Sequence, residues 1–253
     1  DHRVVINYFS RKEKADALIA ECQAIAPVSK PILSDTSSTP HTIDSHDSSG
    51  GMFHDNESPR FHVIQADLSI KADAERLVKE TLATMGRLDV IVSNQGWTKL
   101  TDFMQLDQQV DEDMWDRCFN VNVKSHLWLL YAAREALEKS PGGGSFVSIA
   151  SLAGVRASGS SLPYSVTNAA QIHLIKGLAT ICGPKIRCNS VSPGLMLTEW
   201  GMKFSEEKRN AAANKAAGKA LAEVEDVAES VAMLVRNRAL TGQNLVVDCG
   251  IAI

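Results

Sequence analysis

The sequence predicts an α/β protein, a doubly wound parallel sheet in a three-layer α/β/α arrangement. Short apolar segments alternate along the chain with longer amphipathic ones, and the short segments are apolar throughout rather than at every second position. Continuous apolar runs of this kind are typical of strands that helices cover on both faces. The length of 253 residues suits one such unit, so we expect a single domain over 1–253.

The expected elements begin with a strand at 3–8. A helix at 12–25 is indicated by apolar residues at three- and four-residue steps, among them Ala15, Leu18 and Cys22. The remaining elements are expected as a strand at 61–66, a helix at 71–85, a strand at 88–92, a long helix at 111–137, a strand at 145–149, a helix at 164–181, a strand at 186–191, a helical flap within 196–221, a helix at 224–235 and a strand at 245–248.

Segment 27–60 differs from the rest of the chain. It is rich in Ser, Pro, Asp, His and Gly and has no periodicity, which predicts a flexible insertion. His41, His46 and His54 stand near aspartates in this segment, so a metal site is an alternative interpretation. A solvated loop is the better one, because nothing in the segment would hold ligands in place. We therefore expect no metal.

The charge and composition exclude several classes of partner. A net charge of −4 gives no basic surface for nucleic acid or for a membrane. No apolar run reaches the roughly 18 residues that a membrane span needs. The five cysteines are scattered and form no C-x-x-C pair, which favours reduced thiols. We expect a cytoplasmic protein.

A polar motif follows the strand at 145–149. Ser151 comes shortly after the strand, Tyr164 lies thirteen residues later, and Asn168 lies four residues after Tyr164, on the same face of a helix. This spacing resembles the active-site signature of the short-chain dehydrogenases/reductases, in which Ser is followed after about a dozen residues by Tyr-x-x-x-Lys. The chain has Asn168 where that family has lysine. The resemblance implies a Rossmann-type fold and oxidoreductase activity.

The resemblance also implies a role for each residue of the motif. Tyr164 would be the general acid/base for hydride transfer between a nicotinamide and a carbonyl or alcohol carbon, and Ser151 would donate a hydrogen bond to the same oxygen. Asn122 matches the helical asparagine that holds a water in the family's proton relay. Asn168 can offer an amide N–H but no charge, which removes about 1–4 kcal/mol of stabilisation from a phenolate. We expect reduced activity rather than none.

Asn94 and Gly96 are expected to bind the cofactor. The family has Asn-Ala-Gly where this chain has Asn94-Gln95-Gly96, and there the small residues let the backbone run close to the cofactor. Gln95 is bulkier than alanine.

Two further segments match the family with an alternative each. Asp67 corresponds to the acidic residue at the adenine edge, but it could also cap the following helix. Pro193, Gly194 and Thr198 match the segment that contacts the nicotinamide end, but Pro-Gly could also be an ordinary turn that ends a strand.

The residues after the first strand favour NADP over NAD. Members that prefer NAD end this strand with an acidic residue for the ribose 2′-hydroxyl. Here Ser10, Arg11 and Lys12 follow instead, and these residues suit a 2′-phosphate. The alternative is that Ser10 caps a helix and the two basic residues are merely exposed.

The resemblance covers the chain from Arg3 onward, and no G-x-x-x-G-x-G motif occurs in it. In the family this Gly-rich turn binds the pyrophosphate and follows the central strand of the order 3-2-1-4-5-6. We therefore expect that the first strand and its turn lie upstream of Asp1.

Two functions remain. The first is an NADP-dependent oxidoreductase acting on a hydrophobic small molecule. The alternative, favoured by Asn168 and Gln95, is a redox-inactive member acting as a binding or scaffold subunit or as a non-redox catalyst. The helices at 111–137 and 164–181 are where the family makes subunit contacts, which implies a homodimer or homotetramer. The apolar character of the substrate is indicated by Trp97, Leu162, Met196 and Trp200.

Overall fold

The computed structural model describes residues 2–25 and 60–253, which form parts of two compact units, Asp1–Gln65 and Ala66–Ile253. Apart from Arg60, the predicted insertion at 27–60 lies outside the described residues. Every strand pair is parallel and every sheet is flanked by helices, which confirms the predicted α/β class. The single domain over 1–253 stays a prediction.

The first unit is a strand–helix–strand arrangement. It consists of β1 (Val4–Tyr8), α1 (Lys12–Ile25) and β2 (Phe61–Gln65), with β1 parallel to β2. α1 packs on both strands, and the Asn7 side chain donates a hydrogen bond to the Ile64 carbonyl oxygen at 3.2 Å. The helix has the predicted bounds. Arg11 directly precedes its first residue, and the alternative role of Ser10 as the helix cap stays a prediction.

The second unit contains a four-stranded parallel sheet. Its strands are β3 (Val90–Ser93), β4 (Gly144–Ile149), β5 (Ile186–Pro193) and β6 (Asn244–Val247), in that order across the sheet. β4 and β5 are almost wholly buried, as their apolar composition predicts. Because all four strands run in the same direction, the segments that follow them lie at one edge of the sheet.

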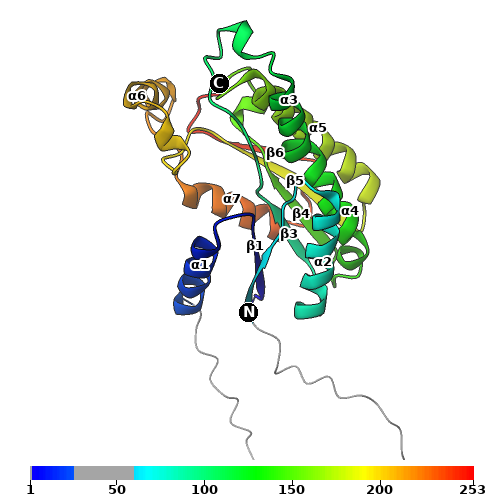
Figure 1. Cartoon of the computed structure of the whole chain (residues 1–253). Coiled ribbons are helices and arrows are strands. Elements are labelled where there is room, and N and C mark those ends of the chain that lie inside the picture. The colour runs from blue at the N-terminus through cyan, green and yellow to red at the C-terminus, as the bar shows by residue number, and fades with distance from the viewer. Residues whose placement is uncertain (1, 26–59) are drawn as a thin grey trace, which may run out of the picture. The chain divides into compact units, whose positions relative to one another are not determined.

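Helices cover both faces of this sheet (Figure 1). α4 (Ser125–Glu138) and α5 (Leu162–Cys182) pack on one face, with α2 (Lys71–Met85) beside α4. α7 (Val224–Arg236) packs on the other face, across β4, β5 and β6. Val147, Val191, Val227 and Leu234 form the core between the sheet and α7.

The helix predicted at 111–137 is helical throughout but changes its winding. It begins as α3 (Glu112–Phe119), where the Asp111 side chain accepts a hydrogen bond from the Met114 amide at 3.1 Å. It continues as a π-helical turn (Asn120–Lys124) and then as α4. A π turn inserts extra backbone into a helix and is common at functional sites. Period counting cannot show such a turn, because the residues around it keep helical spacing.

The segment predicted as a helical flap contains two separate helices. A short 3-10 turn (Gly201–Lys203) precedes α6 (Glu206–Lys215), whose first turn is capped by Ser205. No helix in the described ranges is both long and apolar enough to cross a membrane. All five cysteines are free thiols, as predicted, although only Cys118 and Cys188 are fully buried.

Candidate active site

Tyr164 lies in the first turn of α5, at the edge of the sheet where the strands end. Ser161 caps this helix, its hydroxyl accepting a hydrogen bond from the Tyr164 amide at 3.3 Å, and Pro163 supplies a favourable first-turn backbone. Ser151 follows β4 and caps a short 3-10 turn through the Ala153 amide at 3.2 Å. The structure therefore places Ser151 and Tyr164 as the spacing predicts, one after a strand and one at a helix start.

Gly154 allows these two segments to come together. A Cβ atom at this position would lie only 2.6 Å from the backbone carbon of Asn168. A larger residue would push the 3-10 turn away from α5 and separate Ser151 from Tyr164. The sequence contains this glycine, but its need for a close helix contact is visible only in the structure.

The surroundings of Tyr164 keep its phenol protonated. Burial raises the pKa of Tyr164 above its ordinary value, and hydrogen bonds with the Ser151 and Asn168 side chains lower it part of the way. The nearby thiol of Cys118, whose own pKa burial raises to about 11, raises the pKa of Tyr164 further. Within the described part of the chain, none of the groups that shift this pKa is a cation.

Asn168 does not take the extended course of a lysine. Its side chain is 3% exposed, and its amide donates a hydrogen bond to the Tyr164 carbonyl oxygen at 2.9 Å. The amide thus stabilises the first turn of α5 and also lies close enough to affect the phenol. It adds a hydrogen bond but no charge.

Asn122 lies in the π-helical turn and connects α5 with the segment after β3. It is 1% exposed, and its oxygen accepts from the Trp97 amide at 2.7 Å. Its nitrogen donates to the Trp97 carbonyl oxygen at 2.9 Å and to the Thr167 hydroxyl at 3.0 Å. Both amide donors are therefore used within the protein, and the predicted water-holding role of Asn122 stays a prediction.

Thr167 and Gln109 are site residues that sequence reasoning missed. Thr167 stands between Tyr164 and Asn168 in the motif and is fully buried, so a polar residue on the inner face of an apolar helix was the available signal. Gln109 is 2% exposed and its oxygen accepts from the Leu162 amide at 2.9 Å, while its nitrogen donates to the Asp102 carbonyl oxygen at 2.8 Å. No local pattern indicates Gln109, because its partners lie on different segments.

The segments that follow β3 and β5 have the features expected for close backbone contact with a ligand. Asn94 and Gly96 are exposed, whereas Gln95 between them is turned toward the interior. At Gly194 a Cβ atom would approach the Cβ of Asp248 to 3.0 Å, so the chain after β5 passes close to the end of β6. Thr198 caps the next turn by accepting a hydrogen bond from the Gly201 amide at 3.2 Å.

The structure shows the positions of Asp67 and of the basic pair after β1. Their roles in ligand binding stay predictions. The Asp67 carboxylate accepts from the amide and hydroxyl of Ser69 at 2.9 and 2.7 Å. The cap position of α2 is Ile70, so the alternative role of Asp67 as a helix cap is wrong. In the first unit, Ser10 and Arg11 are exposed and Lys12 pairs with Asp16 at 2.6 Å.

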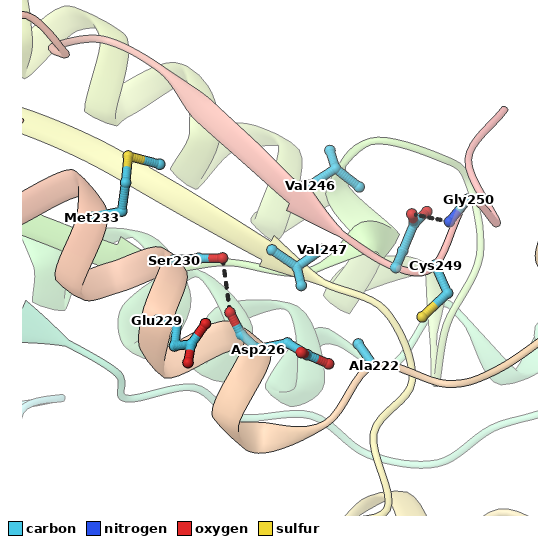
Figure 2. A pocket seen from close by; sticks show the side chains of 10 residues that line it. Ala222, Asp226, Glu229, Ser230, Met233, Val246, Val247, Cys249 and Gly250 are labelled. Carbon is cyan, nitrogen blue, oxygen red and sulfur yellow. Dashed lines mark hydrogen bonds between the residues drawn. The ribbon is translucent and has the colours of Figure 1, made fainter. Parts of the chain in front are cut away.

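A hollow of about 620 Å³ lies elsewhere on the second unit, between α7 and the end of β6 (Figure 2). Asp226 and Glu229 of α7 line it, together with Val246 and Val247 of β6. Ser151, Tyr164, Asn122 and Asn168 are not among its lining residues. The hollow is therefore distinct from the tyrosine site.

Comparison with known proteins places the chain among enzymes of carbonyl and alcohol chemistry. The family model described as enoyl-(acyl carrier protein) reductase matches residues 53–252. A Streptomyces violaceoruber protein, whose name describes a ketoacyl reductase of the granaticin polyketide synthase, is 38% identical over 193 residues, which cover 74% of this chain and 75% of the relative. The 7alpha-hydroxysteroid dehydrogenase of Bacteroides fragilis is 34% identical over 183 residues, covering 71% of this chain and 70% of the relative.

Solved structures agree with this placement. A short-chain dehydrogenase from Burkholderia cenocepacia J2315, in complex with NADP, superimposes with a TM-score of 0.78 at 25% identity and covers 99% of this chain and 88% of that chain. A short-chain dehydrogenase/reductase from Burkholderia xenovorans has a TM-score of 0.78 at 22% identity, covers 98% of this chain and 87% of that chain, and shows the shared fold.

Proposed function

Because the chain belongs to the short-chain dehydrogenase/reductase family, we propose that it transfers a hydride between NADP and a carbonyl or alcohol carbon of a hydrophobic small molecule. The proposal rests on one observation. Ser151, Tyr164 and Asn168 lie together at the edge of a parallel sheet where its strands end. Ligands of such sheets bind outside the carboxyl ends of the strands.

Tyr164 is the acid in this proposal. In carbonyl reduction its phenol gives a proton to the oxygen that gains negative charge, and Ser151 donates a hydrogen bond to the same oxygen. A protonated tyrosine is the form that reduction needs, and burial maintains that form. Asn168 supports the phenol through hydrogen bonding, so turnover is slower than with a neighbouring cation.

The residues of the second unit fit the nicotinamide end of the cofactor. NADPH, when bound, supplies the hydride. Asn94 and Gly96 are exposed after β3, and Pro193, Gly194 and Thr198 lie at and after the end of β5. Asp67 is assigned to the adenine edge. In the first unit, the exposed Ser10 and Arg11 are assigned to the 2′-phosphate, which favours NADP over NAD.

The preference for a hydrophobic substrate rests on large apolar side chains in three segments of the second unit. Trp97, Leu162 and Trp200 are all half-buried, so part of each side chain is open to a ligand. Arg117 stacks on the Trp97 ring, with its guanidinium carbon 4.6 Å from the ring centroid, and this contact restrains the indole. Met196 is half-buried too, but it packs against the core under α7.

Exposed apolar side chains and free thiols support two further proposals, on the assembly and on the location of the protein. Tyr131 of α4 is 63% exposed and Ile181 of α5 is 78% exposed, which favours a homodimer or homotetramer through these helices. Five free thiols favour the cytoplasm.

A redox-inactive binding or scaffold role is the second candidate. It is favoured by Asn168, because the amide satisfies a backbone carbonyl and brings no charge to the phenol. Under this alternative the protein binds a ligand at the same sheet edge without hydride transfer.

One assay separates the two candidates. NADPH consumption is followed with a panel of apolar and aromatic ketones, and NADH is compared at the same concentration. Tyr164→Phe is expected to lower kcat by about a hundredfold or more, since it removes the proton donor but keeps the ring. Tyr131→Phe, a matched loss of a hydroxyl that keeps the ring on the proposed subunit surface away from the active site, is expected to leave kcat unchanged. NADPH binding without turnover in the unmodified protein would favour the scaffold role.

A further inference from the structure

Gln95 belongs to a buried polar cluster with Ser93, Ser125 and His126, here called the Gln95 cluster. Its amide nitrogen donates to the Ser125 hydroxyl at 2.8 Å, and the Ser93 hydroxyl donates to its oxygen at 3.1 Å. Nδ1 of His126 lies 2.8 Å from the Ser93 hydroxyl. Ser93, Ser125 and His126 are at most 1% exposed.

One arrangement of protons satisfies the shorter contacts of this cluster, and it leaves the 3.4 Å approach of the Gln95 nitrogen to Nδ1 of His126 without a hydrogen bond. The Ser93 hydroxyl proton goes to Gln95, so Ser93 must accept a hydrogen bond from Nδ1–H of His126. Ser125 accepts from Gln95 and passes its own proton to the Val121 carbonyl oxygen at 2.6 Å. Burial lowers the pKa of His126 to about 3, so its ring is neutral and carries its one proton on Nδ1. Nε2 is a buried acceptor that has no partner within the described residues.

The Gln95 cluster is one of two anchors that join the loop after β3 to the same helix. Gln95 binds Ser125, and Trp97 binds Asn122 through both its amide and its carbonyl oxygen. The two loop residues are two positions apart, and the two helix residues, three positions apart across the π-helical turn, both contact this loop. Gly96 lies exposed between the anchors.

We propose that Gln95 is a positioning residue, which holds the backbone of Asn94–Trp97 in the position in which it contacts the cofactor. This inference rests on the proposed function for its consequence in catalysis. An alanine at this position would keep the Asn122 anchor but lose the Ser125 anchor, so the exposed backbone between β3 and Trp97 would move more freely. In the sequence, the bulk of Gln95 suggests an obstacle to the cofactor. In the structure, its side chain points to Ser93 and Ser125 in the interior.

The test compares Gln95→Ala with Gln105→Ala, a matched change at an exposed glutamine whose side chain makes no hydrogen bond in the described structure. In the protein without cofactor, amide hydrogen exchange at Gly96 and Trp97 is expected to rise about tenfold in Gln95→Ala. The KM for NADPH is expected to rise about tenfold while kcat changes little. Gln105→Ala should change neither quantity.

Ser125→Ala provides a second, more conservative removal of the same anchor. It is expected to reproduce both effects, and a double variant Gln95→Ala/Ser125→Ala should be no worse than Gln95→Ala alone. Unchanged exchange and unchanged KM in both single variants would overturn the proposal. A fall in Tm with equal increases in exchange across the whole second unit would also overturn it, since that result indicates a structural role only. If the unmodified protein shows no turnover, the proposed function fails, while the exchange measurement still decides the positioning role.

Discussion

Gln95 and Asn168 are the two positions at which the site departs from the residues that its family pattern leads one to expect, and the structure accommodates them differently. Gln95 adds a large polar side chain, and two neighbours, Ser93 and Ser125, supply the partners that it needs. Asn168 replaces a cation, and its amide turns to the backbone of its own helix. The side chain of Gln95 takes up more space than an alanine but forms hydrogen bonds. At Asn168, no other group in the described part of the chain replaces the missing positive charge.

The difference shows that polar groups are easier to compensate than charges. A hydrogen bond is satisfied by any correctly placed donor or acceptor, and serines on adjoining elements provide several. A charge acts on Tyr164 only from a group that is itself charged, and no cation shifts its pKa within the described residues. The first departure therefore adds contacts to the loop after β3, and the second leaves the Tyr164 phenol without a cation that would lower its pKa.

The largest expected effect is on alcohol oxidation, which needs the phenolate of Tyr164. Since burial raises the pKa of Tyr164, oxidation in the unmodified protein should rise about tenfold per pH unit, or about a thousandfold between about pH 6 and pH 9. Ketone reduction uses the protonated phenol and should stay nearly flat over this range. Both profiles are measured as kcat/KM.

Asn168→Lys should sharpen this result. A cation beside the phenol lowers the pKa of Tyr164, so the oxidation profile should level off at lower pH. Asn210→Lys, which adds the same charge at an exposed position on α6, should leave the profile unchanged. A plateau near neutral pH in the unmodified protein would contradict the assignment of Asn168.

Asn122→Ala should test how strongly Asn122 stabilises the contact between the loop that contains Gln95 and the helix that contains Asn168. The substitution removes three buried hydrogen bonds, two to Trp97 and one to Thr167. At about 1 kcal/mol each, the free energy of unfolding should fall by about 3 kcal/mol in denaturant titrations. Asn120→Ala removes only an exposed contact with Lys124 and should cost less than about 0.5 kcal/mol. Equal losses of unfolding free energy in the two variants would show that the hydrogen bonds of Asn122 do not stabilise this contact.

The smallest expected effect concerns the stability of the protein in acid, to which His126 of the Gln95 cluster contributes. Burial lowers the pKa of His126 from 6.5 to about 3. The unfolded chain therefore takes up this proton first, and stability is lost as pH falls below 6.5, by about 2 kcal/mol at about pH 5. His126→Gln should remove this contribution to the pH dependence of unfolding. His173→Gln, at an exposed position of α5, should retain it, and identical slopes in the two variants would argue against a neutral buried His126.

The sequence by itself determined the order of elements, the parallel sheet and the grouping of the residues to which the catalytic role is assigned. The bounds of α1 and α2 are as predicted, because helical periodicity is a local property. Ser151, Tyr164 and Asn168 come together for a similar reason: one follows a strand of the sheet, and the other two are a single turn apart on the next helix.

Only the tertiary structure decided what the polar side chains contact. Asn122 bonds to Trp97, 25 residues away, and Gln95 bonds to Ser125, 30 residues away. The direction of Gln95, the π-helical turn beside it and the roles of Thr167 and Gln109 all depend on such pairs. A local pattern contains no information on these pairs, because a buried polar group is placed by the donors and acceptors that distant segments bring within hydrogen-bonding distance.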